Sequence, residues 1–176
     1  MTSSYRPLLP IALVGFMGAG KSTLGRRLAS TLQLPFWDLD EEVERGSGKT
    51  IPELFRGDGE ESFRRLESDL LEVLLQKGPA VIALGGGVLG RRENLEAVLR
   101  HSHLIYLRLP WPRLSAELDR LRGGRPMLQE RSPLEVRELF EQREPFYLQA
   151  HLTVDIRHDS IEADLERIAN ALGRET

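Results

Sequence analysis

The stretch from Gly15 to Thr23 has the residue types and the spacing of a site that binds phosphate groups. It reads Gly-Phe-Met-Gly-Ala-Gly-Lys-Ser-Thr and lies between an apolar run, Ile11 to Val14, and a helical pattern, Leu24 to Leu32. This is the setting that the loop motif G-x-x-x-x-G-K-[ST] requires. Glycines let backbone N–H groups approach an anion closely, and the following helix adds partial positive charge at its N-terminus. An ordinary glycine-rich turn is the alternative, but all four fixed positions rarely coincide by chance. We therefore predict a nucleoside triphosphate site.

Four side chains near this loop could act on a phosphoryl group. Lys21 can reach the β- and γ-phosphates, and the Ser22 hydroxyl can ligate Mg²⁺. Asp38 and Asp40 end the second short strand, where residues two apart point the same way, so both could face the loop. We expect Asp38 to hold Mg²⁺ with Ser22 through water, and Asp40 to bind an acceptor hydroxyl and take its proton. The alternative for Asp40 is that it caps the next helix. The residues expected around the nucleotide are Gly18, Ala19, Gly20, Lys21, Ser22 and Thr23.

Three consecutive glycines and three arginines from separate parts of the chain could form an acceptor site. Gly85, Gly86 and Gly87 follow a buried strand directly, so a substrate could approach their backbone closely; a flexible loop or helix cap is the alternative. Arg64, Arg125 and Arg143 lie beside sequence breaks, and an arginine fork pairs bidentately with carboxylate or phosphate. Glu67, three residues after Arg64 on a helix, could hold its guanidinium group. The arginines expected to be solvated on helices are Arg26, Arg27, Arg91, Arg92, Arg100 and Arg137.

The elements that must position these residues alternate along the chain. Strand patterns cover residues 11–14, 36–38, 80–84, 103–109 and 152–156. Helical patterns cover 24–32, 40–45, 60–77, 92–100, 112–121 and 161–172, and capping boxes at Thr50 and Ser132 begin two more, the second running to about Tyr147. The alternation predicts an α/β fold with a parallel sheet and helices on both faces. The face expected to be core in the 60–77 helix is Phe63, Leu66, Leu70, Val73 and Leu74.

Length and composition set limits on the function. The 176 residues suggest a single domain, with residues 1–9 as a flexible tail and residues 122–131 as a mobile connection. A net charge of −3 gives no sign of nucleic-acid binding, and no apolar run is long enough to cross a membrane, so we expect a cytoplasmic protein. The absence of cysteine excludes disulfides and thiolate chemistry. The four histidines show no metal-ligand spacing and are expected at the surface or at strand edges.

At this point the chain resembles the shikimate kinases from Ile11 to about Leu172. The resemblance implies a monomeric P-loop, nucleoside-monophosphate-kinase-like three-layer sandwich with five parallel strands in the order 2-3-1-4-5. It also implies ATP- and Mg²⁺-dependent phosphorylation of the 3-hydroxyl of shikimate, in aromatic amino-acid biosynthesis. The matching segments are Gly15 to Thr23, Asp38 to Asp40, Asp58 to Glu67, Gly85 to Gly87, Arg125 to Leu128 and Arg143 to Tyr147.

The resemblance also implies residue roles. Lys21, Asp40 and Arg125 would be catalytic, with Arg125 in a lid, about 122–131, touching the transferring phosphate. Lys21, Ser22 and Asp38 would serve ATP·Mg²⁺. The lid is short, so either Arg120 or Arg122 could stack on adenine, and Met127 replaces the family's usual leucine without a large change in volume. The residues that would hold shikimate are Asp40, Arg64, Gly86, Gly87 and Arg143.

Two other functions fit parts of the sequence. A kinase for another small molecule, such as a gluconate kinase-like enzyme, would share the fold; two arginine forks in one pocket favour a carboxylate-bearing acceptor over a neutral polyol. A non-catalytic sensor that binds ATP or shikimate would have no need of a base such as Asp40. A GTPase is disfavoured because the chain has no Asn-Lys-x-Asp motif for guanine.

Overall fold

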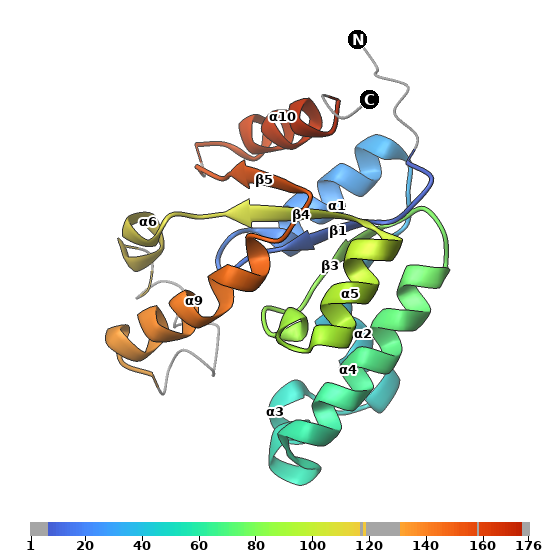
Figure 1. Cartoon of the computed structure of the whole chain (residues 1–176), viewed down its shortest axis with the longest axis vertical. Coiled ribbons are helices and arrows are strands. Elements are labelled where there is room, and N and C mark those ends of the chain that lie inside the picture. Colours follow the sequence, from blue (N-terminus) through green and yellow to red (C-terminus); the bar gives the residue numbers. More distant parts are fainter. Residues whose placement is uncertain (1–6, 117, 119–130, 158, 174–176) are drawn as a thin grey trace.

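The computed structural model describes residues 7–116, 118, 131–157 and 159–173. Its centre is a parallel sheet in the strand order β2-β3-β1-β4-β5, which confirms the predicted order (Figure 1). In the middle strand, Ile11 lies opposite Val81 of β3 and His103 of β4. Strands β1 and β3 are buried throughout, because helices cover both faces of the sheet. The bounds are β1 Ile11–Val14, β2 Phe36–Asp38, β3 Val81–Ala83, β4 His103–Arg108 and β5 Leu152–Asp155.

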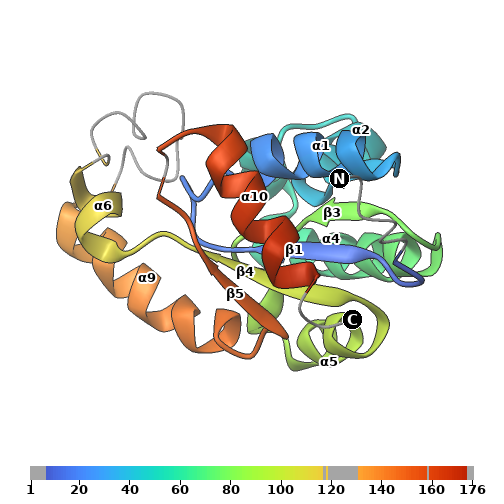
Figure 2. The same cartoon turned by 90° about the horizontal axis from the view of Figure 1, so that it is seen from above.

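The helices form a layer on each side of the sheet. Helices α1 (Lys21–Leu32) and α10 (Ile161–Leu172) cover one face, and α4 (Gly59–Gln76), α5 (Arg92–His101) and α9 (Pro133–Tyr147) cover the other (Figures 1 and 2). This arrangement confirms the three-layer sandwich. Four shorter elements complete the described fold: α2 Leu39–Ser47, α3 Ile51–Gly57, the 3₁₀ turn η1 Val88–Gly90 and α6 Trp111–Ala116.

Local sequence signals set where several helices begin and end. Thr50 and Glu53 form the predicted capping box at the start of α3, and Ser132 and Glu135 form the one at the start of α9. Helix α1 ends at Leu32, followed by Gln33 with a positive φ of 56°. These boundaries fall where the sequence predicted them. Capping side chains bind the first N–H groups of α3 and α9, whereas the end of α1 is capped by the backbone N–H of Gln33.

The predicted core face of α4 is partly wrong. Phe63 and Leu74 are buried as expected, but the Val73 residue is 51% exposed. The residues that complete the buried face are Glu67, Leu71 and Leu75. A charged residue, Glu67, therefore lies in the middle of the buried face of α4. The prediction used apolar residues alone, so it missed Glu67 and wrongly included Val73.

Apolar side chains form two clusters of unequal size. The larger fills the space between the sheet and its helices. The smaller consists of Val43, Leu54 and Phe63, with Leu66 and Leu70 packed against it, and lies between α2, α3 and the first turns of α4. In the part of the chain that the structure describes, no helix has both the length and the apolar composition needed to cross a membrane.

Some predictions lie outside the described residues. The structure describes the predicted 112–121 helix only as α6 and at Leu118. The predicted lid is described only at Arg131, and the tail only at residues 7–9. Arg120, Arg122, Arg125 and Met127 are therefore not placed.

Candidate active site

The loop between β1 and α1 has the geometry of an anion-binding turn. Gly20, with φ of 83°, precedes the first turn of α1 and has no side chain that could cap the first N–H groups of this helix. The Lys21 ammonium group donates to the carbonyl oxygen of Gly15 at 2.9 Å, which holds it against the loop backbone. A Cβ atom on Gly15 would lie 2.6 Å from the Leu107 carbonyl oxygen, so only glycine lets the loop pass this close to β4. The loop can therefore bind phosphate groups through its N–H groups and Lys21.

One hydroxyl and one carboxylate meet beside this loop. The Ser22 hydroxyl donates to Oδ2 of Asp38 at 2.5 Å, and Oδ1 of Asp38 accepts from the backbone N–H of Asp40 at 3.2 Å. Such hard oxygen ligands suit Mg²⁺, which proteins usually hold through one or two carboxylates and the substrate phosphates. The side chains present therefore fit a magnesium ion bound together with a nucleotide.

The reason why Asp38 and Asp40 face one site differs from the prediction. Strand β2 ends at Asp38, so Asp40 lies in the first turn of α2 and not on the strand. Asp38 is the residue that caps α2, which makes the alternative prediction of a capping role for Asp40 wrong. The two carboxylates converge because the turn into the helix brings Asp40 back toward the loop.

The buried carboxylate of Glu67 and the partly buried carboxylate of Asp40 converge on Gly85. A Cβ atom there would lie 2.8 Å from Oδ1 of Asp40 and 2.6 Å from Oε1 of Glu67, so glycine is the residue that leaves room for both. Burial raises the pKa of the Asp40 carboxyl group, and the nearby Asp38 charge raises it further, against the opposing effect of Lys21 and Arg64. Burial also raises the pKa of Glu67. A raised pKa makes Asp40 a stronger base than an exposed aspartate.

The guanidinium groups of Arg64 and Arg143 converge on Gly87. A Cβ atom there would lie 2.9 Å from one Arg64 nitrogen and 3.2 Å from one Arg143 nitrogen. As predicted, Glu67 holds Arg64, at 2.8 Å. Burial lowers the pKa of Arg143, and the adjacent Arg64 charge adds to this effect. Two cations in such proximity favour a bound anion, and their planar forks match a carboxylate.

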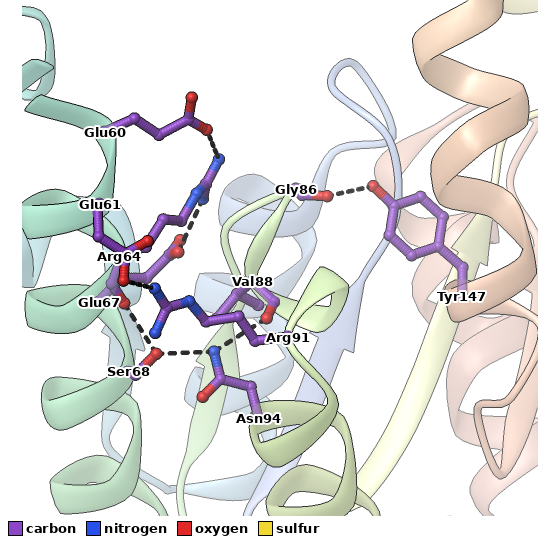
Figure 3. A network of polar contacts seen from close by, with 10 residues as sticks. All are labelled: Glu60, Glu61, Arg64, Glu67, Ser68, Gly86, Val88, Arg91, Asn94 and Tyr147. Carbon is purple, nitrogen blue, oxygen red and sulfur yellow. Dashed lines mark hydrogen bonds and ion pairs between the residues drawn. The ribbon is translucent and has the colours of Figure 1, made fainter.

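Tyr147 fixes the glycine loop from the other side. Its hydroxyl donates to the carbonyl oxygen of Gly86 at 2.6 Å (Figure 3). Burial raises the pKa of Tyr147 to about 12, so the phenol remains a donor at neutral pH. The sequence alone predicts no role for the Tyr147 side chain, and for Gly85 it predicts only that a substrate can approach the backbone. For Tyr147 a signal was present, because it follows Arg143 by four residues and so lies on the same side of α9.

A cavity of about 330 Å³ opens beside the arginine pair. Arg91 lines it, although the sequence predicted a solvated helical residue: Arg91 precedes α5, and its guanidinium group lies 2.6 Å from Oε1 of Glu61. A larger cavity, about 610 Å³, lies beside α6 and α9, and none of the predicted site residues that the structure describes lines it. We therefore place the acceptor part of the site at the smaller cavity. The residues that line this cavity are Glu60, Arg64, Gly86, Gly87, Leu89, Gly90, Arg91, Leu139, Gln142, Arg143, Phe146 and Tyr147.

The structure gathers most of the predicted site residues at one edge of the sheet. They come from five segments: the loop after β1 with the start of α1, the end of β2 with the start of α2, the loop after β3, helix α4 and helix α9. Arg125 is the exception, since it lies outside the described residues. The predicted residues at this edge are Gly18, Ala19, Gly20, Lys21, Ser22, Thr23, Asp38, Asp40, Arg64, Gly86, Gly87 and Arg143.

Comparisons with known proteins give the family. The model of a family described as shikimate kinase matches residues 17–173. The chain is 38% identical to the shikimate kinase of Oceanobacillus iheyensis over 162 residues, which are 92% of this chain and 88% of that protein. It is 40% identical to that of Thermus thermophilus over 173 residues, 96% of this chain and 92% of that protein. The structure of shikimate kinase from Acinetobacter baumannii in complex with shikimate matches with a TM-score of 0.90 and 33% identity, covering 100% of this chain and 99% of the other. The chain therefore belongs to the shikimate kinase family.

Proposed function

We propose that this chain transfers the γ-phosphoryl group of ATP to the 3-hydroxyl of shikimate, giving shikimate 3-phosphate and ADP. The observation that carries the proposal is the convergence of Arg64 and Arg143 on Gly87, on the sheet edge that bears the phosphate-binding loop. Membership of the shikimate kinase family supports it. The proposal extends to the setting that the resemblance implies: one kinase domain over residues 1–176, monomeric and cytoplasmic, acting on a small molecule.

The acceptor side of the site has a base and an anion clamp. In this proposal the shikimate carboxylate lies between Arg64 and Arg143, and the backbone of Gly86 and Gly87 approaches the ring. Asp40 accepts a hydrogen bond from the 3-hydroxyl and takes its proton as the phosphoryl group arrives. Its raised pKa favours proton uptake.

The nucleotide side of the site stabilises phosphate charge. The proposal places the β- and γ-phosphates against the N–H groups of residues 18–23, with the Lys21 ammonium group beside the transferring oxygens. Ser22 and Asp38 would hold Mg²⁺, which when bound neutralises charge on the phosphates. In this division, charge neutralisation and proton removal are carried out by different side chains.

A coupled assay of ADP release tests the proposal. We expect turnover with shikimate, and none above background with gluconate or nucleoside monophosphates. The methyl ester of shikimate keeps the 3-hydroxyl but lacks the negative charge, so its KM should be much higher than that of shikimate. Turnover of gluconate, or equal KM values for the acid and its ester, would contradict the proposal.

Arginine variants test the clamp separately. Arg64→Lys and Arg143→Lys keep the positive charge but lose the planar fork, so each should weaken shikimate binding by roughly tenfold to a hundredfold and leave ATP affinity unchanged. Arg92→Lys is the matched control, because Arg92 lies on the exposed surface and pairs with Glu96. If the two site variants lost ATP affinity instead, these arginines would belong to the nucleotide.

A further inference from the structure

The two parts of the proposed acceptor site belong to different elements. Arg64 lies on α4, whereas Gly86 and Gly87 lie on the loop that follows β3 and continues into η1. Their separation must be fixed, because a Cβ position on Gly87 is only 2.9 Å from the Arg64 guanidinium group. A small displacement of the loop from α4 would therefore change the shape of the anion clamp.

A buried amide joins the two elements. Asn94, in the first turn of α5, is only 6% exposed. Its Nδ2 donates to the carbonyl oxygen of Val88 in η1 and to the hydroxyl of Ser68 in α4, both at 3.0 Å (Figure 3). The orientation of the amide is set by Val88, because turning it over would bring two oxygens together.

The chain of hydrogen bonds continues to Arg64 itself. The Ser68 hydroxyl accepts from Asn94 and donates to the backbone carbonyl oxygen of Arg64 at 2.8 Å. A continuous series of hydrogen bonds thus connects the Val88 carbonyl oxygen, through Asn94 and Ser68, to the backbone of Arg64. Buried paths of this kind resist distortion, since each lost contact leaves a polar group without a partner.

A second contact between the same elements is weaker. Arg91 pairs with Glu61 at 2.6 Å, but the side chains are 32% and 67% exposed. Water and salt screen such a pair, and its long side chains lose conformational freedom when they hold one geometry. The buried amide is therefore the contact that fixes the distance.

We propose that Asn94 is a positioning residue for substrate binding: through Ser68 it holds Arg64 at the separation from Gly86 and Gly87 that the shikimate carboxylate requires. This inference rests on the proposed function, which makes Arg64 a substrate ligand. Asn94 does not touch the substrate. It acts by joining α4 to the loop.

Single and double variants test this inference. Asn94→Ala and Ser68→Ala interrupt the same path from its two sides, and each should raise the Kd for shikimate by about tenfold while the Kd for ATP stays unchanged. The double variant should bind shikimate no more weakly than the worse single variant, because one broken path cannot be broken twice. Thermal unfolding, measured in parallel, distinguishes a selective loss of shikimate affinity from a general loss of stability.

Ser102→Ala is the matched control. Ser102 lies at the other end of α5, is 2% exposed, and donates to the carbonyl oxygen of Val98 at 2.7 Å. Its loss removes a buried hydrogen bond from the same helix without touching the path to Arg64. We expect Ser102→Ala to lower the Tm and leave the shikimate Kd unchanged.

The outcomes separate this inference from the proposed function. If Asn94→Ala and Ser68→Ala lower only the Tm, as Ser102→Ala does, the positioning role is overturned. If Asn94→Ala does not fold, Ser68→Ala alone decides, because it removes only a small half-buried hydroxyl from α4. Arg64→Ala is measured beside them: if it keeps shikimate affinity, the proposed function fails and this inference with it. If Arg64→Ala loses that affinity and the path variants keep it, only the positioning role fails.

Discussion

At the scale of single residues, the proposed chemistry depends on charged side chains that are largely removed from water. Asp40 is the clearest case, because burial and the neighbouring Asp38 charge both raise its pKa. The same environment that makes Asp40 a better base makes its ionised form costly for the folded chain. Each pKa unit of such a shift corresponds to about 1.4 kcal/mol of folding free energy. Stability and activity therefore oppose each other at this position.

Asp40→Asn should accordingly stabilise the protein and inactivate it. The folded-state pKa lies above the ordinary value of 3.8, so wild-type stability is fully present below that value and decreases as pH rises through the folded pKa. Asparagine does not ionise, so the Tm advantage of the variant should grow as pH rises from below 3.8 through the folded pKa of Asp40, and stay level above it. Turnover should fall by roughly 10²–10⁴-fold, as expected for the loss of a general base. Thermal melts across pH and a steady-state assay measure the two effects.

Asp155→Asn is a control with the opposite sign. The Arg108 guanidinium group donates to Asp155 at 2.6 Å and lowers its pKa. This stabilisation is present above the ordinary pKa and is lost as pH falls through the folded one, so Asp155→Asn should be destabilising at pH 7.5 and progressively less so in acid. If both variants showed the same slope, burial would not be what sets the pKa of Asp40.

Lys21 offers a test on the nucleotide side. Lys21→Ala should abolish phosphoryl transfer, since it removes electrostatic stabilisation worth roughly several kcal/mol where charge develops on the transferring group. The fold should survive, because the loop is also held by Phe16, whose buried ring packs edge-on against Phe140 at 5.4 Å. Circular dichroism and the ADP-release assay check both parts. Near-normal turnover would contradict the nucleotide assignment.

At the scale of elements, the three glycines after β3 are the point where the acid–base and anion-binding groups meet. The Cβ position of Gly85 lies against the Asp40 and Glu67 carboxylates, and that of Gly87 lies against the two guanidinium groups. The alternative prediction was a flexible loop or a helix cap. The Tyr147 hydroxyl binds the carbonyl oxygen of Gly86, the Asn94 amide binds that of the following Val88, and Gly87 caps η1, so the loop is held at both ends. Glycine at positions 85 and 87 therefore leaves space for the two carboxylates and the two guanidinium groups.

Alanine substitutions in this loop should separate its two functions. Gly85→Ala places a methyl group 2.6 Å from Glu67 and 2.8 Å from Asp40, so the carboxylates must move and kcat should fall. Gly87→Ala displaces both guanidinium groups, so the KM for shikimate should rise. Displacements near 1 Å in a site can cost on the order of 10²-fold. Gly57→Ala is the control, since a Cβ atom there has no neighbour within 4 Å among the described residues and Gly57 does not line the cavity. Equal kinetics for all three variants would contradict this account.

The elements also show what the sequence could predict. Strand order, both capping boxes and the position of the phosphate-binding loop depend on local signals or on family motifs, and the structure confirms them. Predictions failed where a polar residue serves two partners. Glu67 interrupts the apolar stripe of α4 because it holds Arg64, and Asp38 caps α2 while it binds Ser22. Arg91 stays partly exposed, as expected, but its pairing with Glu61, 30 residues away, was not predicted. No local pattern reports such contacts.

At the scale of the whole molecule, the two apolar clusters imply two levels of stability. The larger cluster includes the sheet and its covering helices, whereas the smaller depends on Val43, Leu54 and Phe63. Few buried contacts allow local opening at a lower free energy than global unfolding. Helices α2 and α3 should therefore open before the sheet does. Asp40 and Arg64 border this region, since they lie on α2 and directly after Phe63.

Hydrogen exchange can establish whether these two levels exist. Backbone amides of α3 should exchange faster than those of β1 and β4 in the wild-type protein. Leu54→Ala, which removes a buried side chain from the smaller cluster, should speed exchange in α2 and α3 and leave β1 unchanged. Leu104→Ala is the control, because it removes the same atoms from a fully buried position in the sheet and should speed exchange throughout, at a cost of about 2–5 kcal/mol. If Leu54→Ala speeds exchange in β1 as strongly as Leu104→Ala does, the molecule opens only as one cooperative unit. If instead the two variants differ as expected, the region that carries Asp40 and the start of α4 can open while the phosphate-binding loop stays in place.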